Sequence, residues 1–234
     1  MEFRRKKITA DEFGSRSFEI VGNNSLFEAY DKDYLRVWPI IYCYERHAPL
    51  SEKISKGLRA FYFPNGVDIT ERKAIADLYA DGVIGFGTNR ATKLLSKYNS
   101  EKVFSYLFNY HGNYTHAYYP NTNRTVPYGV SHHDDLLYLF YVSVLTPLFN
   151  AAPESEIVDK MTKIWSNFAR TGSPTQSGAA NNVLGSVQWP PFNLESESFM
   201  DIDTKLVVRE KLYDSRYTTW SGLIPLNGNS DSKS

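Results

Sequence analysis

The chain has 234 residues, with 26 lysines and arginines against 26 aspartates and glutamates, so its formal net charge is zero. This balance gives no electrostatic reason to expect nucleic acid or an anionic membrane as a partner. Hydrophobic residues make up 42% and charged residues 22%, which is a globular composition and not a disordered one. The single cysteine, Cys43, excludes an internal disulfide framework and a cysteine-based zinc cluster. No apolar run approaches the ~20 residues of a membrane-spanning helix.

Only part of the first half of the chain has a clear secondary-structure pattern. Residues 1–17 are polar, have no hydrophobic periodicity and lack the apolar run of a signal peptide, so an irregular segment is expected. Alternation over 18–21, followed by a Gly-Asn turn, predicts a short strand. Apolar residues at helical spacing from 51 onward predict a helix that ends before a Pro-Asn-Gly turn. A second helical pattern, weakened by internal glycines, follows over 70–98.

The second half contains clearer elements. The aromatic segment 103–110 predicts a strand and precedes a long polar loop. An apolar stripe predicts a helix that begins at 153 and ends near Gly172. Residues 205–212 predict a last strand, and a flexible tail is expected over 223–234. Because strands and helices alternate along the chain, the sequence favours α/β architecture.

Three segments carry a resemblance to a known family. The segment 129–140, GVSHHDDLLYLF, resembles the surroundings of the catalytic histidine in type-B carboxylesterases, the cholinesterase-like α/β-hydrolases. The segment 161–174, MTKIWSNFARTGSP, is similar to a hallmark helix of that family, and 20–25 is similar to the turn that delivers the catalytic acid. The match runs over 18–222, and insect carboxylesterases and juvenile-hormone-esterase-like proteins look like the nearest branch. The resemblance implies the C-terminal half of an α/β-hydrolase fold, with the later strands of the central sheet and their flanking helices.

The resemblance implies that His132 is the catalytic base, which takes a proton from a serine and returns it to the leaving group. His133 occupies a position that is usually small in the family. Because neighbouring side chains of an extended segment face opposite ways, we expect its imidazole to point outward. Asp134 and Asp135 are expected to hydrogen-bond the loop and cap the next helix, in preference to forming a metal site with the two histidines. We expect neither a metal nor a cofactor.

The catalytic acid and the nucleophile are less clear. The family places a glutamate just after the turn that ends here at Ser25, and Glu28 comes one residue late. Glu28 is therefore a possible acid; the alternatives are a solvated carboxylate on a helix face, or an acid that has been deleted. The sequence contains no Gly-x-Ser-x-Gly nucleophile elbow. The resemblance implies that the nucleophile and the oxyanion donors belong to an N-terminal half that the chain lacks.

Other residues suit the extracellular setting that the family implies. Asn23, Asn113 and Asn123 each begin an Asn-x-Ser/Thr glycosylation sequon in a turn-rich segment. Cys43 lies between two tyrosines and is expected to be a buried, inert thiol.

The resemblance implies a hydrolase whose substrate is a small molecule with a carboxylic ester, and which is inactive as this chain alone, because triad members act as a unit. Two alternatives remain: a noncatalytic adhesion domain in the manner of neuroligin or neurotactin, and a truncated gene product. A sheet that lacks its earlier strands would expose an unpaired edge. We therefore expect either aggregation or a partner that covers this edge.

Overall fold

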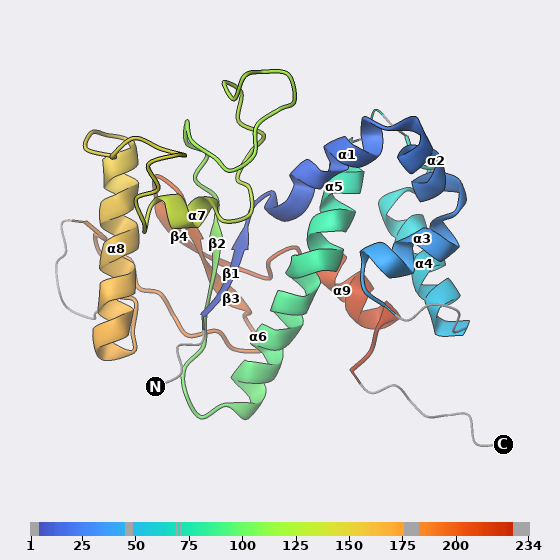
Figure 1. Ribbon diagram of the computed structural model, residues 1–234. Helices are drawn as coiled ribbons and strands as arrows, with labels where there is room; N and C mark the ends of the chain where they lie inside the picture. The colour runs from blue at the N-terminus through green and yellow to red at the C-terminus, as the bar shows by residue number, and fades with distance from the viewer. Residues whose placement is uncertain (1–4, 45–48, 69, 71, 176–182, 227–234) are drawn as a thin grey trace. The chain divides into compact units, whose positions relative to one another are not determined.

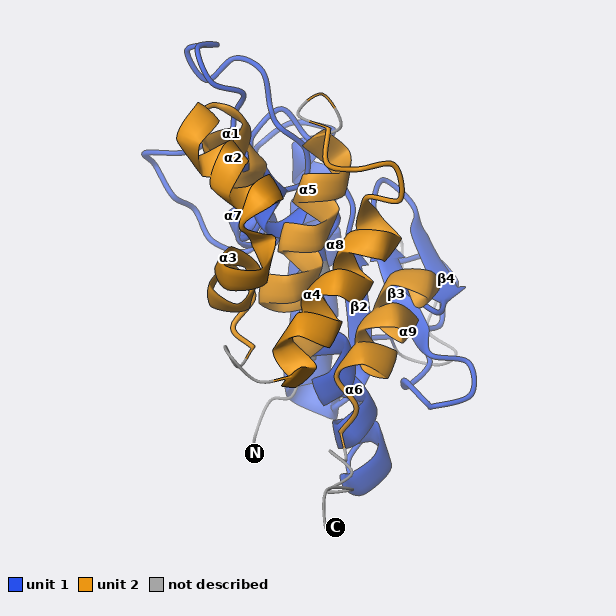
Figure 2. Cartoon of the chain, turned by 90° about the vertical axis from the view of Figure 1, so that its right-hand side faces the viewer, with its two compact units in different colours: residues 1–15, 88–212 blue, residues 16–87, 213–234 orange. Residues whose placement is uncertain are grey.

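The computed structural model describes residues 5–44, 49–68, 70, 72–175 and 183–226. The chain divides into two compact units, which Figure 2 colours separately. Unit 1 comprises residues 1–15 and 88–212, and unit 2 comprises residues 16–87 and 213–234.

Unit 1 is built on a four-stranded sheet with the order β1-β2-β3-β4 (Figure 1). The strands are Arg5–Thr9, Phe104–Phe108, Ser198–Ile202 and Leu206–Glu210. β2 runs parallel to both β1 and β3, whereas β4 is antiparallel to β3. Every side chain of β3 is buried, as expected for a strand that is covered on both faces. The fold is α/β, as the alternating elements predict.

The long helix α8, Glu154–Thr171, supplies much of the core of unit 1. Its buried stripe shares one hydrophobic cluster with residues of β2 and β3, and the helix members of this cluster are Ile157, Met161, Ile164 and Phe168. The helix ends at Gly172, which adopts φ 72° and donates its backbone N–H to the carbonyl of Phe168. Unit 1 also contains the short helix α7, Asp134–Leu137, and most of α6, Phe86–Tyr98.

Unit 2 is helical. Its elements are α1 (Ser17–Val21), α2 (Asn24–Lys32), α3 (Tyr34–Ile41), α4 (Pro49–Tyr62), α5 (Arg72–Ala80), the π-helical turn η2 (Asp81–Gly85) and α9 (Asp214–Leu223). Aromatic rings fill its interior, and Tyr30, Trp38 and Trp220 are at most 1% exposed. None of the helices in the described ranges is long and apolar enough to cross a membrane.

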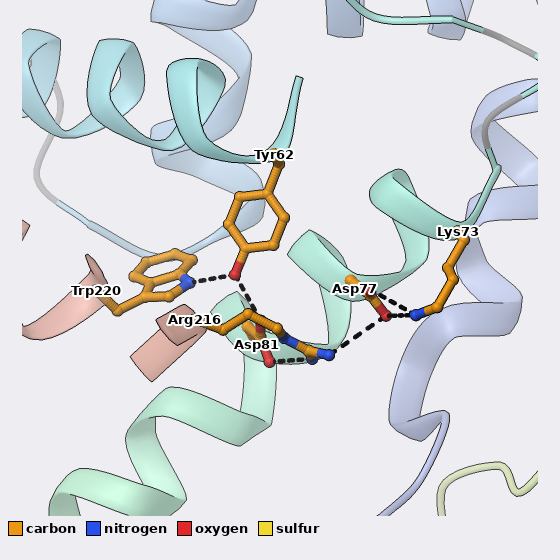
Figure 3. Close-up of polar contacts among 6 residues, drawn as sticks. All are labelled: Tyr62, Lys73, Asp77, Asp81, Arg216 and Trp220. Atoms are coloured by element: carbon orange, nitrogen blue, oxygen red, sulfur yellow. Dashed lines mark hydrogen bonds and ion pairs between the residues drawn. The ribbon is translucent and has the colours of Figure 1, made fainter. Parts of the chain in front are cut away.

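A buried ion pair connects the two chain segments of unit 2 (Figure 3). The carboxylate of Asp81, in η2, accepts hydrogen bonds from Arg216 Nε at 2.6 Å and from its terminal nitrogen at 2.5 Å. Tyr62 also donates its hydroxyl to this carboxylate, and the Trp220 indole N–H donates to Tyr62. The Asp81 carboxylate, in a residue with only 1% exposure, thus accepts three hydrogen bonds from side chains of two helices, α4 and α9.

The structure corrects three expectations. The segment expected to be irregular, 1–17, contains regular structure in its described part, because Arg5–Thr9 pairs with β2 and Glu12–Arg16 forms the 3-10 helix η1. Residues 18–21 belong to a helix and not to a strand; four alternating residues are too few to distinguish the two periods. Strand β3 is not among the predicted elements, because Ser198 and Asp201 interrupt the apolar pattern of its five residues. The expected tail falls partly on residues 227–234, which lie outside the described residues.

Candidate active site around Glu12 and His132

Glu12 lies just after β1, at the start of η1, and its side chain is 2% exposed. One carboxylate oxygen, Oε1, accepts a hydrogen bond from the backbone N–H of Thr9, the last residue of β1. The other oxygen, Oε2, lies 2.7 Å from Nδ1 of His132. Because a buried carboxylate is costly without hydrogen-bond partners, these two contacts hold the group in one orientation.

The loop that carries His132 is tied to the same segment by its backbone. The His132 N–H donates to the carbonyl of Glu12 at 3.1 Å. Asp11 donates its N–H to the carbonyl of Val130 at 2.9 Å, and its Oδ2 accepts the N–H of Val130 at 2.9 Å. A Cβ on Gly129 would come within 2.4 Å of this Oδ2, so the close approach requires glycine. Strand β1 therefore positions the acid and the histidine together.

This arrangement supports acid–base chemistry at one nitrogen of the ring. A carboxylate on Nδ1 favours the tautomer in which Nδ1 carries the proton. It also stabilises the imidazolium cation that forms when Nε2 accepts a second proton. The histidine side chain is 22% exposed, whereas its acid is buried. The pair can therefore exchange a proton with a group outside it while the acid stays shielded from water.

Asp134, two positions after His132 in the sequence, holds the same loop through its carboxylate. Its carboxylate, in a residue that is 3% exposed, accepts hydrogen bonds from the hydroxyl of Thr115 and from the backbone N–H groups of His116 and Ser131. These bonds confirm the expectation that Asp134 hydrogen-bonds the loop. Burial raises the pKa of Asp134 from 3.8 to about 6, against the lowering effect of the three hydrogen bonds.

The raised pKa of Asp134 makes folding stability depend on pH. The folded state holds the proton more tightly than the unfolded state, so this group stabilises the fold fully below about pH 4 and loses that contribution as the pH rises through about 6. Asn at this position does not titrate. We expect the unfolding free energy of the wild-type chain, minus that of Asp134→Asn, to fall by about 1–3 kcal/mol between pH 4 and pH 7. Urea unfolding at both pH values measures this difference, and a difference that stays constant or grows with pH contradicts it.

His133 does not point away from His132 as expected. Its ring centroid lies 3.7 Å from that of His132, with 36° between the planes. His133 has φ 75°, a left-handed conformation that breaks the alternation of an extended segment and brings neighbouring side chains together. For a residue other than glycine, this backbone conformation costs about 1–2 kcal/mol.

Glu28 is not the carboxylate that contacts His132. It lies in the exposed part of α2, and its Oε1 accepts a hydrogen bond from Lys32 Nζ at 2.7 Å. This bond lowers the pKa of Glu28. The structure gives Glu28 the solvated position on a helix face that was the alternative interpretation.

Sequence reasoning missed Glu12 because the acid lies in the segment expected to be irregular. One signal was available: the β-branched pair Ile8-Thr9 is followed within five residues by Asp11 and Gly14, which is typical of a turn at the end of a strand. In open α/β sheets, functional side chains gather at the carboxyl ends of the strands. The parallel pairing of β1 and β2 places Glu12 at that end.

The remaining candidates lie on the surface. Asn23, Asn113 and Asn123 are all exposed, and Asn23 caps α2 by accepting two backbone N–H groups. Glycosylation at these residues stays a prediction. Cys43 is exposed and not buried as expected, because it follows the end of α3 in a left-handed conformation. In the described ranges, no group of three or more His, Cys, Asp or Glu side chains is placed to bind a metal.

A comparison with solved structures identifies a protein of similar fold. A juvenile hormone esterase structure from Manduca sexta, with OTFP covalently attached, superimposes with a TM-score of 0.70 at 19% sequence identity. The alignment covers 93% of this chain and 40% of that one. This likeness identifies the fold as part of an α/β-hydrolase.

Curated relatives match in sequence. Bile salt-activated lipase from Bos taurus is 28% identical over 140 residues, which cover 58% of this chain and 21% of the lipase. Juvenile hormone esterase from Tribolium castaneum is 29% identical over 134 residues, covering 53% of this chain and 22% of the esterase. The chain thus spans well under half of the length of these relatives. The sequence model of the carboxylesterase family matches residues 7–220, and the chain therefore belongs to this family.

Proposed function

We propose that this chain is the part of a serine carboxylesterase that carries the catalytic base, His132, and its acid, Glu12. The observation that supports the proposal is the 2.7 Å contact between Glu12 Oε2 and His132 Nδ1, made by a carboxylate that is 2% exposed. Nε2 of His132 takes the proton of a serine hydroxyl as the serine attacks an ester carbonyl. Glu12 stabilises the imidazolium during this step, and Nε2 then returns the proton to the departing alcohol.

The nucleophile in this proposal comes from a segment outside the chain, since no Gly-x-Ser-x-Gly pentapeptide occurs in the sequence. β1 is the end strand of the described sheet, so its outer edge is available to pair with another strand. We propose that the nucleophile-bearing segment adds its strands at this edge. Strand pairing there would bring the serine to the carboxyl end of the sheet, where Glu12 and His132 lie.

We expect the isolated chain to be inactive as an esterase. A base without its nucleophile gives at most weak, unselective hydrolysis, because the members of a triad act as a unit. A fluorophosphonate probe, which labels an activated serine, and hydrolysis of p-nitrophenyl acetate measure this. The chain alone should show neither stoichiometric labelling nor turnover.

The positive arm of the experiment uses the chain produced together with the nucleophile-bearing part of a related carboxylesterase. Labelling of one serine is expected there, and it should disappear with His132→Ala. Stoichiometric labelling of a serine within the chain alone would overturn the proposal. A complex that assembles yet is never labelled would favour the noncatalytic adhesion role.

A further inference from the structure

The imidazole of His132 is packed between more groups than the acid–base pair requires. The ring of Phe13 lies 4.2 Å from it, centroid to centroid, at an interplanar angle of 32°. The ring of His133 lies still closer, at 3.7 Å. His133 in turn meets His116 edge-on at 6.0 Å, with 77° between the planes. The histidine is thus stacked against two rings from two chain segments.

A hydrogen bond to one ring nitrogen leaves a degree of freedom. The contact between Glu12 and Nδ1 fixes where that nitrogen lies, but the imidazole plane can still rotate about the line that joins the two atoms. Rotation of the plane would redirect Nε2, the nitrogen that must face a serine hydroxyl. A ring stacked at van der Waals distance opposes this rotation.

We propose that His133 is a positioning residue that holds the ring plane of His132 and thereby aims its Nε2. The proposal rests on the proposed function of His132 as the base. His133 itself touches no reacting atom in this assignment; it acts through the neighbouring ring.

The backbone of His133 separates this role from a purely structural one. Its φ of 75° lies in the left-handed region, which glycine adopts without strain. If the His133 side chain merely supported the fold, replacing it with glycine would lower stability through the lost contacts without changing the orientation of the His132 ring. If it positions His132, the same replacement should loosen the ring of His132 even though the chain is no less stable. Orientation and stability are therefore expected to change independently.

The experiment on the chain itself compares His133→Gly, His133→Asn and His133→Phe with the wild type. Asn tolerates the left-handed conformation but carries no ring, whereas Phe keeps a ring to stack. NMR measures the ring-current displacement of the His132 ring protons and their nuclear Overhauser contacts with Phe13. Both should be lost in the Gly and Asn variants and retained in the Phe variant. The melting temperature of the Gly variant should equal or exceed that of the wild type.

The second arm measures turnover in the complex with a nucleophile-bearing part. We expect kcat to fall about tenfold in the Gly and Asn variants with KM unchanged, and to stay within about twofold of the wild type in the Phe variant. If the wild-type complex has no activity, the proposed function fails, but the NMR arm still decides whether His133 positions the ring. Unchanged His132 signals in the Gly variant, or failure of Phe to retain them, would overturn the positioning role.

Discussion

Glu12→Gln is expected to lower kcat of the reconstituted esterase by about four orders of magnitude, the effect that an amide in place of the acid has in a serine triad. The geometry shows why the amide cannot substitute. Oε1 of Glu12 accepts the N–H of Thr9, so the amide oxygen of Gln must stay there to avoid opposing two donors. The NH₂ group then faces Nδ1 of His132 and donates to it. The proton moves to Nε2, and His132 can no longer accept one from serine.

The matched control is Glu28→Gln, which removes a carboxylate of the same type from an exposed ion pair with Lys32. We expect this variant to keep its activity within about twofold, because solvent screens an exposed pair of this kind and its loss changes the fold little. Steady-state kinetics measures both variants, and nitrogen-15 NMR of the His132 ring reports the tautomer. The assignment of the acid is wrong if Glu12→Gln retains activity within tenfold, or if Glu28→Gln has the larger effect.

The parts of the fold that the sequence predicts are those in which hydrophobic periodicity and burial agree. Helix α8 and strand β2 follow this rule, since their apolar residues lie in one core cluster. The segment around His132 is also recognisable, because its residue types are set by the chemistry of the base. Strand β1 and the acid behind it are not predictable in this way. β1 is defined by the pairing of its backbone with β2, which leaves no alternating pattern in the sequence.

The error in placing the acid follows from this difference. Glu12 and His132 are 120 positions apart, and their contact depends on the parallel register of β1 and β2. Glu28 lies near a turn that resembles that of the family, so local sequence similarity favours it. The stacking of His133 is missed for a related reason: the sequence does not reveal that a residue other than glycine adopts a positive φ there.

Arg216→Met is expected to reduce the free energy of unfolding of unit 2 by about 3–5 kcal/mol, the usual cost of leaving one partner of a buried ion pair uncompensated. Asp81 is 1% exposed, so without the guanidinium its charge has no access to water. The Tyr62 hydroxyl would remain as a donor, but a single neutral donor does not balance a buried carboxylate. Urea unfolding followed by tryptophan fluorescence measures the loss, since Trp220 lies in the same cluster.

Two further variants separate charge from packing. The double variant Asp81→Asn with Arg216→Met removes both charges and should be less destabilised than Arg216→Met alone, because no unpaired ion stays buried. Lys73→Met removes an ion pair with Asp77 whose lysine side chain is 82% exposed, and it should cost less than about 1 kcal/mol. A loss below 1 kcal/mol for Arg216→Met, or a double variant as unstable as the single, would contradict the prediction.

The order of the chain determines which element depends on this ion pair. Unit 2 consists of two segments, 16–87 and 213–234, which residues 88–212 separate along the chain. Asp81 lies in the first segment and Arg216 in the second, 135 positions later. Bringing together ends so distant costs loop-closure entropy that local contacts cannot recover. Because the ion pair, Tyr62 and Trp220 form one hydrogen-bonded cluster across the two segments, its loss should release α9 from the helices of the first segment.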